Sequence, residues 1–172
     1  MIAGNDGMGA RKFALIFVAL LVSGVLGLSY SVQVFPLRLT DGDKTEIIKL
    51  TLERAIVAKE IPDYHMIEDK ENMVLSTENI DPDLVSKISG VNLTLLDPDK
   101  IQEKADREGD FLFLRFKHIQ INGWRVIVSL DNIWAIGKNS QSRYLSGGGF
   151  TIKYYRGLFG GWVGEGMAAW ES

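Results

Sequence analysis

Hydrophobic and polar positions follow three different spacings along this chain. No charged residue occurs between Lys12 and Arg38, and most of that stretch is apolar. From Lys44 to Glu60 the apolar residues recur three and four apart, which is typical of an amphipathic helix. From Phe111 onward apolar and polar residues alternate, as in half-buried strands. The pattern therefore predicts an apolar N-terminal helix, a mainly helical section and a sheet.

The apolar run predicts a membrane span over residues 13–32, because ~20 apolar residues cross the hydrocarbon core of a bilayer. Arg11 and Lys12 come just before it, so the positive-inside rule keeps residues 1–12 cytoplasmic. Residues 33–42 become a tether, and the domain at 43–172 becomes periplasmic or extracellular. The expected localisation is thus single-pass membrane, with the lipid bilayer as a partner.

Two other interpretations of this run stay open. Ser29 and Ser31 offer a small-residue site at which a signal peptide is cleaved, but Phe13–Leu28 is long for a signal sequence. A buried core helix is the other alternative. If the span is retained, small residues on it allow close packing with another helix. These residues are Ser23, Gly24 and Gly27.

The helical section contains three predicted helices. The first runs from Lys44 to Glu60 with Asp43 as its N-cap, and Pro62 ends it. Asp-Pro pairs, which combine a cap with a proline in the first turn, open the other two. The second helix spans residues 81–89, and the third runs from Asp97 to Glu108 before Gly109. Two short apolar segments, at 73–75 and 91–96, separate these helices.

The last section predicts a four-stranded antiparallel meander. The strands cover residues 111–121, 124–134, 150–154 and 162–170. The apolar parity shifts near Lys117–His118, which indicates a β-bulge. Asn122-Gly123 is a strong signal for a type I′ hairpin turn. The expected fold class is α+β, with three helices packed on the concave face of a curved four-stranded sheet.

Charge and composition exclude several functions. The net charge of −3 argues against general nucleic-acid binding, and the absence of cysteine excludes disulfides and thiolate sites. Residues 38–110 hold ten basic and eighteen acidic side chains, whereas residues 111–172 hold seven basic and three acidic ones. The chain therefore offers an acidic helical half and a basic sheet half.

The helices ahead of a curved meander, the Asn122-Gly123 hairpin and the bulge resemble the nuclear-transport-factor-2-like roll, also called the cystatin-like fold. The resemblance covers roughly residues 43–170. The stretches Tyr144–Gly149 and Pro62–His65 are also similar to those of uncharacterised single-anchor bacterial proteins. Roll proteins include isomerases, dehydratases, binding modules and secretion-system assembly domains, so the resemblance does not select one function.

Candidate catalytic residues are few. Roll enzymes use an Asp, His or Tyr inside the cone, and Asp63, Tyr64 and His65 follow the first helix. Asp131 is a second acidic candidate, although its parity points it away from the core. His118 is a further imidazole within a strand. For each of these a structural role is the simpler interpretation, because spacing fixes no partner for it.

The sequence predicts no metal site and no cofactor. Asp63, His65, Glu68 and Asp69 lack the spacing of a calcium loop. Gly147–Gly149 lacks the Lys-Ser/Thr pair of a phosphate-binding loop.

The four tryptophans all fall in the sheet section, and most are expected in the core. The glycine-rich strand from Trp162 to Trp170 carries little charge, which favours an exposed edge that another chain completes. Trp162 and Trp170 are therefore candidate interaction residues, with Ser23, Gly24 and Gly27 in the predicted span.

The leading hypothesis is a non-enzymatic, membrane-anchored accessory or assembly subunit whose roll domain docks on other subunits of a membrane protein complex. One alternative is a module that holds a small apolar ligand in the cone. The other is a lyase- or isomerase-type enzyme of the same fold.

Overall fold

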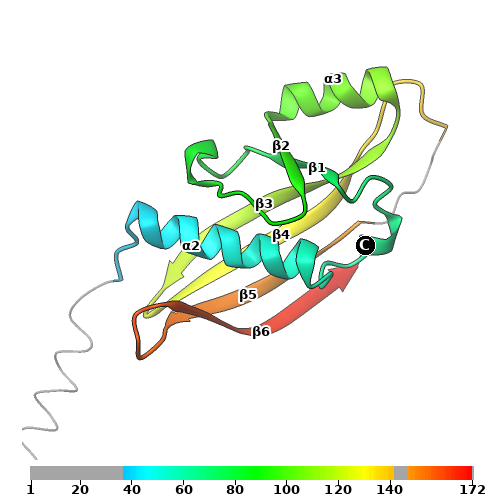
Figure 1. Cartoon of the computed structure of the whole chain (residues 1–172). Helices are drawn as coiled ribbons and strands as arrows, with labels where there is room; N and C mark the ends of the chain where they lie inside the picture. The colour runs from blue at the N-terminus through cyan, green and yellow to red at the C-terminus, as the bar shows by residue number, and fades with distance from the viewer. Residues whose placement is uncertain (1–36, 142–146, 172) are drawn as a thin grey trace, which may run out of the picture. The chain divides into compact units, whose positions relative to one another are not determined.

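The computed structural model describes residues 37–141 and 147–171. In these residues the chain forms one mixed sheet with the strand order β2-β1-β3-β4-β5-β6 (Figure 1). The strands are β1 (Asn72–Ser76), β2 (Asn92–Leu96), β3 (Phe111–Asn122), β4 (Arg125–Ala135), β5 (Gly148–Arg156) and β6 (Trp162–Glu171). The α-helices of the described part are α2 (Asp41–Leu52) and α3 (Pro98–Glu108).

The predicted roll of three helices on a four-stranded meander is wrong. The meander β3-β4-β5-β6 is present, but β1 and β2 extend the sheet by parallel pairing. The predicted helix at 81–89 is only a 3₁₀ turn, η3 (Pro82–Leu84). Asp81 caps that turn through the backbone N–H of Asp83, yet so short a segment cannot repay the cost of nucleating a helix.

The prediction of a single-pass membrane protein is not supported. The helices at 37–141 and 147–171 are all too short or too polar to cross a membrane. For example, α2 spans 12 residues, against the ~20 that a bilayer requires, and carries acidic and basic side chains. The predicted span at 13–32, with Ser23, Gly24 and Gly27, lies outside the described residues. The localisation and the bilayer partner that rested on this span are not retained.

The first predicted helix is present with different ends. Its N-cap is Thr40, and Asp43 occupies the third helical position, where the two side chains form a reciprocal capping box. The α-helix ends at Leu52 and continues as a single π-helical turn, η1 (Glu53–Val57). The expected N-cap thus acts one turn later, because Thr40 supplies the oxygen that Asp43 N–H needs.

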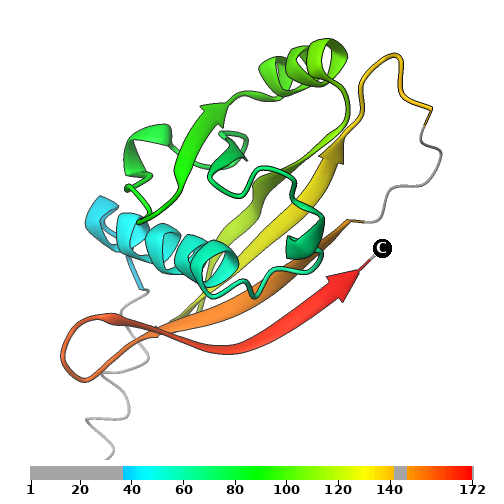
Figure 2. The ribbon, with the colours of Figure 1, turned by 45° about the vertical axis from the view of Figure 1, so that its right-hand side comes forward.

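In Figure 2, α2 lies over one face of the sheet, and the residues of the main core fill the space between them. Large side chains fill this space, so the concave face of the described sheet is packed. The largest fully buried ones include Phe116, Phe150, Tyr154, Leu52 and Ile56. A second, smaller cluster joins α3 to the opposite face through Val74, Ile101, Ala105, Phe113 and Ala135.

The β3–β4 hairpin confirms the predicted bulge, because its register shifts between Phe116 and His118. The turn differs from the prediction by one residue. Asn122 pairs with Arg125, so Gly123 and Trp124 form the two-residue loop. In that loop Gly123 alone has a positive φ, of 63°, which fits a type II′ turn rather than a type I′ turn.

Candidate functional site

Asp63, Tyr64 and His65, the candidates after the first helix, lie in and beside a short turn. Tyr64 and His65 lie in the 3₁₀ turn η2 (Tyr64–Met66), where His65 is exposed. The ring of Tyr64 packs against the main core, and the amino group of Lys70 lies 5.8 Å from its centroid. Asp63 begins this turn with a φ of 57°, and its Oδ2 is buried without a hydrogen-bond partner among the described residues.

Asp131 lies on the face of the sheet opposite Leu130, as its parity predicts, but only 2% of it is exposed. Its Oδ2 accepts a hydrogen bond from Arg115 Nη2 at 3.2 Å across the β3–β4 pair. Arg115 also reaches the carboxylate of Glu78 at 3.5 Å. This arrangement buries the acid in an ion pair with Arg115.

The indole of Trp170 covers the neighbouring position on β5. Gly149 pairs with Asp131 on one side and with Trp170 on the other. A Cβ atom at Gly149 would lie 2.8 Å from Cε2 and Cζ2 of Trp170, so only glycine allows this approach. Arg115, Asp131, Gly149 and Trp170 therefore form one row across four strands.

The expectation that most tryptophans lie in the core is wrong. Trp162 is buried, and its Nε1 donates to Asp43. Trp134 is half-buried, while Trp170 is 37% and Trp124 is 61% exposed. Trp124 lies in the hairpin turn and not on β4. It therefore does not share the alternating buried positions that were predicted for the strand at 124–134.

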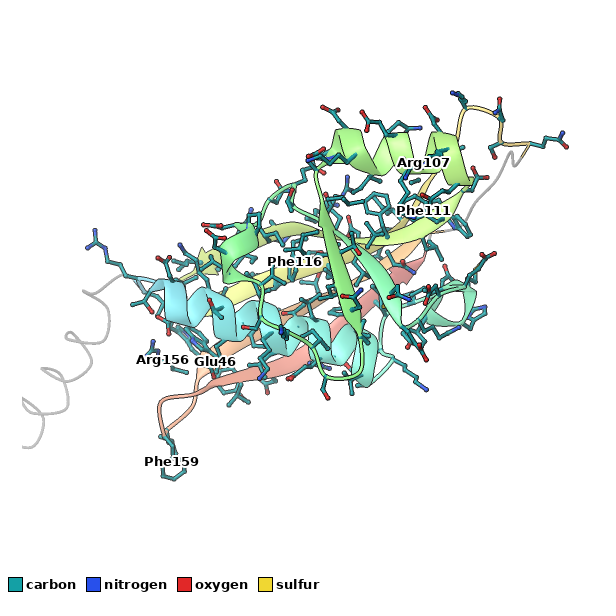
Figure 3. All side chains as sticks on the ribbon, turned by 45° about the horizontal axis from the view of Figure 1, so that its top comes forward. Glu46, Arg107, Phe111, Phe116, Arg156 and Phe159 are labelled. Carbon is teal, nitrogen blue, oxygen red and sulfur yellow. The ribbon has the colours of Figure 1, made fainter. Side chains whose placement is uncertain are left out.

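Exposed apolar side chains gather on the turn ends of the two hairpins. Leu158 and Phe159, at the tip of the β5–β6 turn, are fully exposed. Figure 3 shows Phe159 projecting from this turn. Trp124 packs edge-on against Tyr155 with 6.2 Å between ring centroids, and Val163 pairs with Tyr155 from β6. We call Trp124, Tyr155, Leu158, Phe159 and Val163 the hairpin patch.

Cationic side chains border the hairpin patch. The guanidinium of Arg125 lies 4.3 Å from the Trp124 ring centroid. Arg156 instead pairs with Asp43 and lies over the ring of Trp162. Lys153 is exposed on β5, opposite Glu165 in the register. The surface thus combines aromatic, aliphatic and basic groups.

A second feature is a cleft where β1 diverges from β3. These strands pair only at Leu75–Leu114 and Ser76–Arg115. The preceding residues of each strand line a cleft of about 650 Å³, a volume in the ordinary range of ligand sites. We call it the β1–β3 cleft. Its apolar lining includes Met73, Val74, Leu96, Phe111 and Leu112, and its rim comes from α3 and the loop at 66–69.

Metal binding has no support in the part of the chain that the structure describes, where no three potential ligands come together. Comparison with protein-family models, with curated proteins and with solved structures found no match. The resemblance to the nuclear-transport-factor-2-like family therefore stays an untested prediction. The hairpin patch and the β1–β3 cleft are the features of the described residues that bear on function.

Proposed function

We propose that this domain is a non-enzymatic docking module that binds another protein through the hairpin patch. The observation that carries the proposal is the full exposure of two adjacent large apolar residues, Leu158 and Phe159, at one hairpin tip. Burying such a side chain gains about 1.5–3 kcal/mol. A partner that covers Leu158 and Phe159 thus gains the free energy of burying two apolar side chains that no described residue covers.

The composition of the surface supports the same function. Residues that dominate protein interfaces are enriched in Trp, Tyr and Arg, and Trp124, Tyr155 and Arg125 lie together here. The edge-to-face contact of the two rings and the guanidinium over the indole hold these side chains in place before binding. Pre-ordered side chains lose less entropy in a complex.

The charge of this region indicates the chemistry of the partner. Within the described residues, Arg125 and Lys153 have no carboxylate partner, and both lie beside the hairpin patch. We infer a partner surface with an apolar pocket bordered by Asp or Glu, because complementary charge speeds association and selects partners.

Two observations favour docking over the alternatives. Side chains fill the space between α2 and the sheet, where a cone would hold a ligand. The two acidic candidates are not brought together. The carbonyl of Pro62, next to Asp63, accepts a hydrogen bond from Asn132, and the Asn132 side chain lies on the face of the sheet opposite that of Asp131.

The test is site-specific photocrosslinking in the native host, with a photoreactive phenylalanine analogue at Phe159 or at Asp83. Asp83 is exposed and lies outside the hairpin patch. We expect a discrete protein adduct from position 159 and not from position 83. The partner identified by mass spectrometry should then bind the double variant Leu158→Ser/Phe159→Ser about tenfold or more weakly.

The proposal fails if both positions give the same adducts, or if position 159 gives none. It also fails if the double variant binds the identified partner as tightly as the unchanged chain. Both substituted side chains are fully exposed, so the melting temperature should stay the same and loss of folding would not explain weaker binding.

A further inference from the structure

We propose that the β1–β3 cleft binds an extended peptide segment that carries apolar side chains and a Lys or Arg. This site lies apart from the hairpin patch and does not rest on the docking function proposed above. The proposal combines three observations: unpaired strand edges, an apolar lining, and an excess of acidic over basic side chains on the rim.

The edges of β1 and β3 that face each other are paired over only part of their length. β1 pairs with β2 along its whole length, and β3 pairs with β4 along its whole length. Between β1 and β3, however, pairing begins only at Leu75–Leu114. Continuing this parallel register backward would match 72–74 with 111–113, but no ladder pairing is present there, and Val74 and Phe113 still pack in one cluster. We infer that an added extended chain hydrogen-bonds to the backbone of the cleft-lining residues before these pairs, 72–73 on β1 and 111–112 on β3.

The lining gives the second observation. Apolar side chains line the cleft from both strands and from the loop before β1, and they include Ile67, Met73, Val74, Leu96, Phe111 and Leu112. An extended chain directs alternate side chains to opposite sides. A segment in this cleft would therefore place one set of side chains toward Met73 and Leu112 and the other set toward Val74 and Leu96.

The charge on the rim gives the third observation. The basic residues of α3 that line the cleft are already paired: Lys100 with Asp97, and both Lys104 and Arg107 with Glu108. Glu68 and Glu103 also line the cleft and are exposed, and neither forms a salt bridge with a described residue, although Asp97 and, more weakly, the nearby Glu103 raise the pKa of Lys100. The residues that line the cleft include five acidic and three basic side chains, so the rim is net negative, which favours a cationic ligand group.

The experiment measures the fluorescence anisotropy of labelled peptides with the purified full chain. The first probe begins with two Lys residues and continues with alternating Val and Thr. The second replaces both Lys residues with Glu, and the third carries N-methyl groups on alternate amides. We expect the first probe to bind, and the other two to bind about tenfold or more weakly.

Charge reversal on the rim supplies the variants. Glu68→Lys and Glu103→Lys should each weaken the first probe about two- to fivefold, because exposed charge pairs contribute modestly, and the double variant should weaken it more. Asp83→Lys is the matched control, since it makes the same change at an exposed residue outside the cleft. Thr94→Trp, which fills the cleft from an exposed position on β2, should abolish binding.

Several results would overturn the proposal. Equal binding of the Lys and Glu probes would remove the charge argument, and equal binding of the N-methylated probe would remove the strand-pairing argument. Binding that survives Thr94→Trp in a chain that still melts cooperatively would place the peptide elsewhere. The Leu158→Ser/Phe159→Ser variant should bind the first probe unchanged, so failure of either proposal can be told from failure of the other.

Discussion

The carboxylate of Asp43, in the first turn of α2, accepts a hydrogen bond from Trp162 Nε1 at 3.0 Å. The same carboxylate accepts bonds from the backbone N–H of Thr40 at 2.9 Å and from the Thr40 hydroxyl at 2.8 Å. Arg156 pairs with it as well. One side chain thus caps the first helix and fastens it to the start of the last strand.

Replacing this carboxylate should be costly. We expect Asp43→Ala to lower the free energy of unfolding by about 3 kcal/mol, because the buried Trp162 N–H loses its acceptor and the capping box loses one of its two hydrogen bonds. Asp43→Asn keeps one acceptor oxygen and should cost less. Urea unfolding followed by tryptophan fluorescence measures both, and equal costs for Ala and Asn would contradict the prediction.

The same residue predicts a loss of stability in acid. Hydrogen bonding by the Thr40 backbone N–H, and then by Trp162, lowers the pKa of Asp43 from 3.8 to about 2 against an opposing effect of burial. The unfolded chain therefore takes up this proton first as the pH falls. The stabilisation is complete above about pH 4 and disappears toward pH 2.

The check is the free energy of unfolding measured from pH 5 to pH 2 in the unchanged chain and in Asp43→Asn. The Asn variant should show a shallower decline in this range, because it has no proton to bind at this position. Parallel curves would show that other carboxylates control the acid response.

The close approach of Trp170 to Gly149 predicts that a single methyl group is not tolerated there. In Gly149→Ala the new Cβ would lie 2.7 Å from the Leu130 carbonyl oxygen and 2.8 Å from the Trp170 ring. We expect a loss of about 2 kcal/mol or more. Gly42→Ala is the control, because its Cβ meets nothing closer than 3.7 Å inside α2 and should leave stability equal or higher. Thermal unfolding compares the two.

The buried ion pair between Arg115 and Asp131 predicts that mutations of the two groups around Arg115 have unequal costs. Arg115→Met should cost about 3–5 kcal/mol, because it leaves the Asp131 carboxylate buried without its cation. Glu78→Gln should cost less than about 1 kcal/mol, since Glu78 is exposed and 3.5 Å away. Denaturant titration of both variants tests the order, and adding Asp131→Asn to Arg115→Met should recover part of the loss.

Local signals in the sequence predicted the elements that local interactions form. The Asp97-Pro98 pair and Gly109 marked α3 correctly, since the cap, the first-turn proline and the C-terminal glycine all act within the helix. The parity shift near Lys117–His118 likewise predicted the bulge. In these two cases, residues that are neighbours in the sequence determine the structure.

The errors in topology and in the site come from contacts between distant segments. No local pattern shows that β1 and β2 join the meander in parallel, because the register depends on residues far along the chain. Parity placed Asp131 on the correct face but could not reveal that Arg115 lies beside it and that the position is buried. The β1–β3 cleft was not predicted at all, since it exists only where two strands separate.

The bond between Asp43 and Trp162 joins residues 119 positions apart. During synthesis α2 emerges long before β6, so the buried face of this helix has to wait for its final partner. Contacts of such long range also slow folding after synthesis is complete. In a growing chain the interval before Trp162 appears is therefore when the apolar face of α2 is most open to aggregation or to a chaperone.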